Sequence, residues 1–196
     1  MAFKYAIALT GGIATGKSTV TSLLKMSGLS VIDADQVAHK MLKKHRIEIG
    51  ELFGEEFLTE DNVNRPKLGT LVFSNEEAKK KLEEFIHPKI FDEISKNSEK
   101  LDKLQFPYLV DIPLFYENKR YDISKVVVVY TPKNLQLQRL LKRNSFTEEE
   151  AQKRINFQID IEEKKSQATF VIDNSKDLVH LSNECEKFIQ YLKQFK

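Results

Sequence analysis

A glycine-rich segment near the start of the chain carries the residues best suited to chemistry: Gly11-Gly12-Ile13-Ala14-Thr15-Gly16-Lys17-Ser18. It matches the pattern G-x-x-x-x-G-K-[ST] at every fixed position, and Thr19 follows it. Glycines allow successive backbone N–H groups to curl around phosphate oxygens without obstruction by a Cβ atom. Lys17 would reach the β- and γ-phosphates, and the Ser18 hydroxyl would hold Mg²⁺. A random match would occur at roughly the 1% level in a chain of this length, so the segment predicts a nucleoside triphosphate site.

Two carboxylates follow in Asp33-Ala34-Asp35, directly after a short apolar run. If a strand continued through them, both side chains would point the same way, at the sheet edge where α/β proteins bind ligands. A carboxylate there could orient an acceptor hydroxyl and take its proton. Two alternatives stay open, a helix N-cap role for either residue and metal binding.

A further carboxylate, Asp111, ends the apolar run Tyr108-Leu109-Val110. This position suits a carboxylate beside Mg²⁺, in direct contact or through water, and a strand-end cap is the alternative. His87 stands before Pro88 within a helical pattern, where proline causes a kink or marks a helix start. A lone histidine is more often structural than catalytic.

A late helical pattern carries Arg139, Lys142 and Arg143. Arg139 and Arg143 are four residues apart and therefore share a helix face. They could fold over a nucleotide as part of a lid and neutralise charge on a transferred phosphoryl group; a solvated basic face is the alternative. The guanine-reading pattern N-K-x-D of GTPases fails at the last residue of Asn118-Lys119-Arg120-Tyr121. The chain length, the interrupting helical segment and the basic late segment are typical of a small-molecule kinase.

The elements that must position these residues are short strands that alternate with helices. Continuous apolar runs, typical of buried parallel strands, occur at Tyr5–Leu9, Ser30–Ile32, Tyr108–Val110, Val126–Tyr130 and Phe170–Ile172. Helical patterns occur at Lys17–Met26, Ala34–Lys44, Asn75–Ser98, Lys133–Lys142, Glu148–Lys164 and Asp177–Phe195. The alternation predicts an α/β fold of the P-loop NTPase type, in which helices flank a five-stranded parallel sheet.

Start residues support two of these helices, and one long stretch departs from the alternation. Thr131-Pro132 offers an N-cap and a first-turn proline, and Thr147 with Glu150 forms a capping box. Residues 34–106 show mainly helical patterns, with turns near Gly54 and Asn64-Arg65-Pro66. We expect one domain over residues 1–196, with core segments at about 1–35, 106–138 and 166–196, a helical substrate-binding insertion at about 36–105 and a helical lid at about 139–165.

Composition narrows the class of protein. Hydrophobic residues make up 41% and charged residues 31%, as in a globular domain, and the net charge of +2 does not suggest a dedicated nucleic-acid binder. Cys185 is the one cysteine, which excludes an internal disulfide and fits a reducing compartment. No stretch approaches the ~20 apolar residues of a membrane span. We expect a soluble, cytoplasmic protein, a monomer or small homo-oligomer, with no nucleic-acid or membrane partner.

Several motifs occur in order along nearly the whole chain. They are Leu9-Thr10-Gly11-Gly12-Ile13 continuing into Gly16-Lys17-Ser18-Thr19-Val20, Val31-Ile32-Asp33-Ala34-Asp35, His87-Pro88, Ile112-Pro113-Leu114-Phe115 with Glu117-Asn118, and Ile172-Asp173-Asn174. Together they resemble the dephospho-coenzyme A kinase family. The combination is specific, since neither adenylate kinases nor shikimate kinases pair this loop with D-A-D and P-L-x-x-E-N.

The resemblance implies transfer of the γ-phosphate of ATP, with Mg²⁺, to the ribose 3′-hydroxyl of dephospho-coenzyme A, the last step of coenzyme A biosynthesis. It implies that Asp35 is the catalytic base, that Asp33 supports substrate binding, and that Arg139 acts with Lys17 on the transferred phosphate. Further residues match substrate-side or lid positions of the family: Arg65, His87, Pro113 and Leu114 on the substrate side, and Arg143 and Arg154 as weaker lid candidates.

Two departures from the family pattern concern the phosphate loop and the lid. Position 14 is Ala where the family usually has Gly, so this residue must keep φ below zero or accept strain. Lys164 stands where an arginine is common, which keeps the charge but loses bidentate phosphate geometry. The alternative functions are another small-acceptor kinase, such as a nucleoside monophosphate kinase, and a non-catalytic nucleotide-binding regulator.

Overall fold

The computed structural model describes residues 2–143 and 146–194, and they contain a five-stranded sheet in the order β2-β3-β1-β4-β5. The strands are β1 (Ala6–Gly11), β2 (Val31–Asp33), β3 (Tyr108–Asp111), β4 (Val126–Tyr130) and β5 (Phe170–Asp173). Strand β1 lies at the centre and pairs in parallel with β3 and β4, and β4 pairs in parallel with β5. The carboxyl ends of these strands therefore meet at one edge of the sheet, and whatever follows β1 lies in the middle of that edge.

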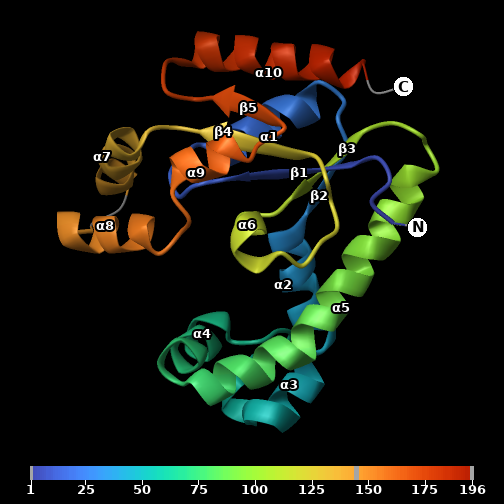
Figure 1. The fold of residues 1–196 in the computed structure, drawn as a ribbon. Helices are drawn as coiled ribbons and strands as arrows, with labels where there is room; N and C mark the ends of the chain where they lie inside the picture. The colour runs from blue at the N-terminus through green and yellow to red at the C-terminus, as the bar shows by residue number, and fades with distance from the viewer. Residues whose placement is uncertain (1, 144–145, 195–196) are drawn as a thin grey trace. The chain divides into compact units, whose positions relative to one another are not determined.

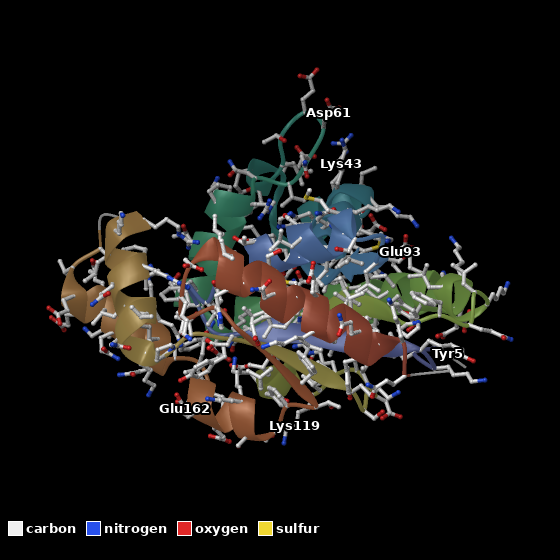
Figure 2. The ribbon with its side chains drawn as sticks, turned by 90° about the horizontal axis from the view of Figure 1, so that it is seen from above. Tyr5, Lys43, Asp61, Glu93, Lys119 and Glu162 are labelled. Carbon is white, nitrogen blue, oxygen red and sulfur yellow. The ribbon has the colours of Figure 1, made fainter. Side chains whose placement is uncertain are left out.

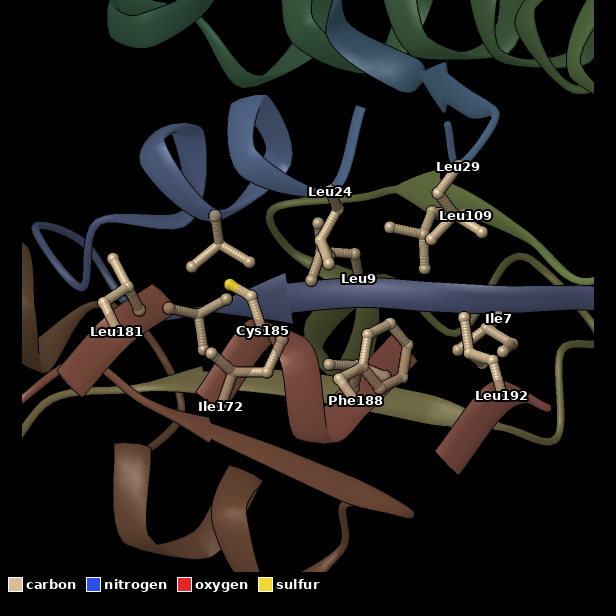
Figure 3. Packing of buried hydrophobic residues seen from close by; sticks show 13 residues of the cluster. Ile7, Leu9, Leu24, Leu29, Leu109, Ile172, Leu181, Cys185, Phe188 and Leu192 are labelled. Atoms are coloured by element: carbon tan, nitrogen blue, oxygen red, sulfur yellow. The ribbon is translucent and has the colours of Figure 1, made fainter. Parts of the chain in front are cut away.

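One face of the sheet is covered by α1 (Lys17–Met26) and α10 (Leu178–Leu192). Alternation along β1 turns Ile7 and Leu9 toward this face, where they meet Leu24 of α1 and Phe188 of α10 in one buried cluster. Figure 3 shows these side chains converging on β1 from the two helices. The cluster fixes α1 beside β1, so the segment that joins them has both ends held by the core.

Further short helices complete the part of the chain that holds the sheet. They are α6 (Phe115–Asn118), α7 (Lys133–Arg143), α8 (Glu148–Asn156) and α9 (Ile161–Ser166). Helices α7 and α8 lie side by side (Figure 1) and share a small cluster of Leu140, Ala151 and Ile155.

A hydrogen bond joins helix α9 to β4, because the Tyr130 hydroxyl donates to Glu162 Oε1 at 2.5 Å. This bond to a carboxylate raises the pKa of Tyr130 to about 12, and Figure 2 labels Glu162 on α9.

Contacts divide the chain into two compact units, one of Met1–Ile32 with Ser98–Lys196 and one of Asp33–Asn97. The second unit is helical, with α2 (Ala34–Lys44), α3 (Arg46–Phe53), a 3₁₀ turn η1 (Glu55–Phe57), α4 (Arg65–Ser74) and most of α5 (Glu76–Asp102). It has its own buried cluster, formed by Ile49, Phe57, Val63 and Leu68. Asp61 marks the exposed tip of the loop between η1 and α4 (Figure 2).

The five predicted strands are confirmed, with bounds that shift by at most two residues. The capping box of Thr147 and Glu150 is confirmed at the start of α8. The turn predicted at residues 64–66 is instead a helix start, because the Asn64 side chain accepts from Lys67 N and Pro66 occupies the first turn of α4. The hydroxyl of Thr131, predicted to cap the next helix, lies instead within 3.1 Å of the Asn174 carbonyl oxygen.

The prediction of one helix over Glu148–Lys164 is wrong, because α8 ends at Asn156 and α9 begins at Ile161. The Asp160 side chain accepts from Glu162 N and so starts a new helix. The last predicted helix ends at Leu192, and its expected end at Phe195 lies outside the described residues, as do residues 144–145 of the expected lid. Within the described ranges, no helix is both long and apolar enough to cross a membrane.

Candidate functional site

The glycine-rich segment joins the end of β1 at Gly11 to the start of α1 at Lys17, and we call residues 11–18 the phosphate loop. Gly16 forms the N-cap of α1 with φ of 85°, a conformation that glycine adopts without strain. A Cβ atom on Gly16 would lie 2.2 Å from Asn174 Nδ2, so the close packing also requires glycine. The loop thus ends at the positive end of a helix of ten residues, where backbone N–H groups attract anions.

Two carbonyl groups of the phosphate loop accept hydrogen bonds from side chains. The Thr15 carbonyl oxygen accepts from Asn174 Nδ2 at 2.8 Å, just beyond the end of β5. The Gly12 carbonyl accepts from the Thr15 hydroxyl at 2.9 Å, within the loop itself. Because these oxygens are engaged by the protein, the loop is organised as a set of amides, as a phosphate-binding nest requires.

Ala14 takes the strained option that its sequence position leaves open, with φ of 60°. A left-handed conformation costs an alanine roughly 1–2 kcal/mol because its Cβ approaches the following carbonyl oxygen. Packing offsets part of this cost, since Ala14 contacts the cluster formed by α7 and α8.

Lys17 and Asp111 form an ion pair at the carboxyl edge of the sheet. The register of β1 and β3 places Asp111 opposite Leu9, two residues before the phosphate loop begins. The Lys17 ammonium contacts Asp111 Oδ1, and the Thr21 hydroxyl donates to Asp111 Oδ2 at 3.0 Å. The Asp111 side chain is buried, with 6% of its surface exposed, so this carboxylate holds the loop lysine in place.

The residues at this edge fit Mg²⁺ bound together with phosphates. The described part of the chain contains no group of three or more His, Cys, Asp or Glu side chains that could hold a metal. Mg²⁺ in kinases is held by one or two protein oxygens, with phosphate oxygens and water as its other ligands. Ser18, exposed in the first turn of α1, and Asp111, whose carboxylate contacts Lys17 and Thr21, carry oxygens that could hold the ion in this way.

A cleft of about 350 Å³ lies beside the phosphate loop. It is lined by Ala14, Gly16, Thr19, Arg139, Asn174, Lys176, Asp177, Leu178 and Leu181. The Arg139 guanidinium donates to the Asn174 carbonyl at 2.8 Å and to the Thr131 hydroxyl at 3.1 Å. Arg143, which should share its helix face, is exposed at the end of α7. The cleft combines a charged rim with apolar side chains, which suits a nucleotide base beside its phosphates.

Strand β2 does not continue from Asp33 to Asp35, so the two side chains do not share a direction as a continued strand would require. Strand β2 ends at Asp33, whose Oδ1 accepts from Gln36 N at 2.9 Å as the N-cap of α2. Asp35 already lies in the first turn of this helix, where it is exposed. The open alternative of helix capping is therefore realised at Asp33, and the Asp35 carboxylate remains accessible.

Two further residues predicted on the substrate side, Arg65 and His87, lie in the helical unit. Arg65 lines a cavity of about 610 Å³ together with Thr59, Val63, Asn64 and Pro66. Its Nη1 lies 3.4 Å from His39 Nδ1. His87 is half-buried within α5, directly before Pro88, which this long helix contains. Arg65 thus lines a cavity in the unit where the substrate was expected to bind.

Pro113 and Leu114 form the turn between β3 and α6 in the unit that holds the sheet. The Thr10 hydroxyl, fully buried at the end of β1, donates to the Pro113 carbonyl at 3.0 Å. This bond joins the turn to the residue that directly precedes the phosphate loop.

Sequence reasoning missed the contacts by which several residues organise the phosphate loop. Thr131 and Asn174 directly follow β4 and β5, and their place after a strand could have indicated them. Gln136 packs against Gly12, where an added Cβ would lie 2.9 Å from Gln136 Oε1. Lys164, read as a residue that keeps a charge for phosphate, is buried against the Gly11 carbonyl. No local pattern points to either of these last two residues, because each acts through a contact distant in sequence.

Comparison with known proteins agrees with this arrangement. A family model described as dephospho-CoA kinase matches residues 5–180. A dephospho-CoA kinase of Sulfurimonas denitrificans is 60% identical over 193 residues, which cover 98% of this chain and 96% of the relative. The solved dephospho-CoA kinase from Campylobacter jejuni superposes with a TM-score of 0.74 at 39% identity, over 97% of this chain and 98% of that one. The structure of TT1252 from Thermus thermophilus gives a TM-score of 0.79 at 30% identity, over 95% and 96% of the two chains.

The family match spans most of the chain, includes the phosphate loop and agrees with the α/β fold built around it. The chain therefore belongs to the dephospho-CoA kinase family.

Proposed function

We propose that this enzyme transfers the γ-phosphate of ATP to the ribose 3′-hydroxyl of dephospho-coenzyme A, which yields coenzyme A and ADP. The observation that carries the proposal is the complete phosphate loop at the carboxyl end of β1, in a chain matched by the dephospho-CoA kinase family over residues 5–180. The new bond joins the 3′-oxygen to the γ-phosphorus, and the bond from that phosphorus to the β,γ-bridging oxygen breaks. The hydroxyl proton must leave during this exchange.

On the nucleotide side, backbone N–H groups of residues 11–19, other than that of Ile13, hold the triphosphate and Lys17 neutralises its charge. Bound Mg²⁺ neutralises further charge on the phosphate oxygens, and Ser18 and Asp111 are the residues that would hold it. Arg139 stabilises the transferred phosphate, and the place of its guanidinium in the lining of the cleft beside the loop supports this role. Arg143, which is exposed, is a second candidate for the same role. Nearby cations stabilise the charge that develops on the transferred group.

On the acceptor side, Asp35 accepts the proton of the 3′-hydroxyl and orients its oxygen toward the phosphorus. Its exposure in the first turn of α2 supports this assignment. Asp33 supports substrate binding while it caps the helix. Arg65, His87, Pro113 and Leu114 bind other parts of dephospho-coenzyme A, and the cavity beside Arg65 supports the inclusion of that residue.

An acceptor screen tests the proposal. Purified enzyme with Mg·ATP is offered dephospho-coenzyme A and, separately, each common nucleoside monophosphate, and ADP formation is followed. We expect strong stimulation by dephospho-coenzyme A alone, with mass spectrometry identifying a product that carries one added phosphate at the 3′ position. Stimulation by a monophosphate would assign a different kinase activity, and binding of ATP without turnover on any acceptor would assign a regulator.

We further propose that the enzyme acts in the cytoplasm, as a monomer or a small homo-oligomer. The buried, unpaired thiol of Cys185 supports a reducing compartment. Cell fractionation with an antibody tests the location, and light scattering during gel filtration measures the mass of the particle.

A further inference from the structure

A buried lysine contacts the first residue of the phosphate loop. The Lys164 side chain has 0% of its surface exposed, and its Nζ donates to the Gly11 carbonyl oxygen at 3.0 Å. The same ammonium lies 2.7 Å from Glu117 Oε1, and the Glu117 side chain is 17% exposed. Lys164 of α9 therefore connects two distant segments, the end of β1 and the helix α6.

Fold stability is a weak explanation for this pair. Removal of two charges from water costs several kcal/mol per ion, and apolar pairs of similar volume are often at least as stable. One oxygen of the pair, Glu117 Oε2, is buried and has no hydrogen-bond partner among the described residues. Stability alone would not require a charged side chain at position 164. The hydrogen bond from Lys164 to the Gly11 carbonyl therefore needs a different explanation.

The Gly11 carbonyl controls the direction of the next amide. A trans peptide is planar, so the Gly11 C=O and the Gly12 N–H point in opposite directions. A donor that holds the oxygen on one side of the loop turns the N–H toward the other side. Lys164 also keeps this carbonyl dipole from turning toward a bound phosphate, which it would repel.

A second contact from the same segment holds the following peptide. Ile13 N donates to Gln158 Oε1 at 2.7 Å. Gln158 lies in the break between α8 and α9, and Ile159 N donates to Glu117 Oε1 at 3.2 Å. Residues 158–164 thus contact the phosphate loop at a carbonyl and at an amide two residues later.

We infer that Lys164 and Glu117, with Gln158 as a second contact, are positioning residues for phosphoryl transfer. They orient the first peptides of the phosphate loop and thereby set the affinity for ATP and the rate of transfer. Lys164 acts through the Gly11 peptide, because its ammonium is enclosed by protein. The effect on turnover rests on the proposed function, whereas the effect on nucleotide binding does not.

Replacing both charged side chains of the pair with uncharged ones separates an effect on protein stability from an effect on nucleotide binding. Lys164→Met alone leaves a buried carboxylate without its partner, so we expect it to lose both stability and nucleotide affinity. The double variant Lys164→Met with Glu117→Gln removes both charges and keeps an acceptor for Ile159 N. We expect its melting temperature to return toward the wild-type value, while affinity for ADP and for ATP remains lower by roughly 10- to 100-fold, the loss typical of a hydrogen bond to a charged group.

Kinetics provide a readout that a purely structural role would not move. In the double variant we expect KM for ATP to rise and kcat to fall, with KM for dephospho-coenzyme A within about twofold of wild type. Lys153→Met is the matched control, because it removes an exposed lysine that pairs with Glu149 on the neighbouring helix α8 and should leave nucleotide affinity unchanged. A folded double variant that binds ADP as tightly as wild type would overturn the inference.

Gln158→Leu covers the case in which the double variant does not fold. Gln158 is half-buried in a connecting segment, so its replacement should be tolerated while the acceptor for Ile13 N–H is lost. We expect nucleotide affinity to fall several-fold, and an unchanged affinity in this variant would also count against the inference. Binding of ADP, measured by calorimetry, does not require dephospho-coenzyme A. A wrong assignment of the phosphate acceptor would therefore leave the change in ADP affinity as expected, whereas failure of the positioning role would remove that change.

Discussion

At the scale of single residues, similar side chains in one motif have different environments. Asp33 and Asp35 are two residues apart, yet the first caps α2 and the second is exposed in its first turn. A side chain that accepts the N-terminal amide of a helix has one oxygen committed to structure. Asp35 has no such duty in the described structure, which makes it the better candidate for proton transfer.

Asp35→Asn should therefore reduce turnover with little effect on ATP binding or on folding. We expect kcat to fall by about 10²–10⁴, the range for loss of a general base, because an amide cannot take the hydroxyl proton. Steady-state kinetics and calorimetric binding of ADP measure the two effects. Asp33→Asn is the comparison for stability, since asparagine caps helices as well as aspartate does. Turnover close to wild type in Asp35→Asn would remove this residue from the mechanism.

Ala14 offers a test of backbone strain inside the phosphate loop. Ala14→Gly removes the Cβ from a residue at φ of 60° and should raise the free energy of unfolding by about 0.5–1 kcal/mol, part of the relief being lost with the methyl contact. Urea denaturation measures the change. Ala151→Gly is the control, because this alanine belongs to the same cluster but lies in helix α8, where glycine should destabilise by about 1 kcal/mol or more. A destabilised Ala14→Gly variant would show that the methyl contact outweighs the strain.

At the scale of elements, the break between α8 and α9 is the feature with the largest consequence. It brings Gln158 to Ile13 and allows α9 to begin at Ile161 with Lys164 facing Gly11. The start of α9 depends on Asp160, which accepts from Glu162 N at 2.9 Å and pairs with Lys133 at 2.7 Å. The hydrogen bond from Lys133 is the main cause that lowers the pKa of Asp160 below its ordinary value.

The pH dependence of this helix start follows from the sign of that shift. A carboxyl group with a lower pKa in the folded state contributes stability above its unfolded pKa, about 3.9 for Asp, and loses it as pH falls through the folded value. Asp160→Asn should thus be less stable than wild type at pH 7, and the difference should shrink below about pH 4. Urea denaturation at pH 7 and pH 3 measures it. In a Lys133→Met background, Asp160→Asn should lower the stability at pH 7 by less than it does with Lys133 present. An equal loss in the two backgrounds would show that Asp160 stabilises the protein through the helix cap alone.

At the scale of the whole molecule, two separate clusters of buried side chains support the two units. The cluster around β1 contains Ile7, Leu9, Leu24 and Phe188 and holds both ends of the phosphate loop. The helical unit has its own cluster around Ile49. The family and the kinase class predicted from the sequence are confirmed by the match over residues 5–180 and by close relatives.

Phe188→Ala should test how far the core of the sheet supports the chain. Phe188 is fully buried, so the loss of its ring should cost about 3–5 kcal/mol of unfolding free energy, from lost burial and from the cavity left behind. Phe73→Ala is the control, since Phe73 is 95% exposed and its replacement should change stability by less than about 0.5 kcal/mol. Equal effects of the two substitutions would contradict the assignment of Phe188 to the core.

The sequence by itself determined the phosphate loop, the five strands, the α/β class and the family, because each depends on local spacing or on motifs in order. A G-x-x-x-x-G-K-S segment between an apolar run and a helical pattern needs no distant partner to be recognised. The roles of the predicted site residues remain proposals, and the pairs of residues that hold the loop were not predictable. Lys164 and Gly11 are 153 residues apart, and Asn174 and Thr15 are 159 apart. Only the packing of α9 and β5 against β4, the neighbour of β1, decides such contacts, since a buried hydrogen bond between distant segments leaves no periodic pattern in either one.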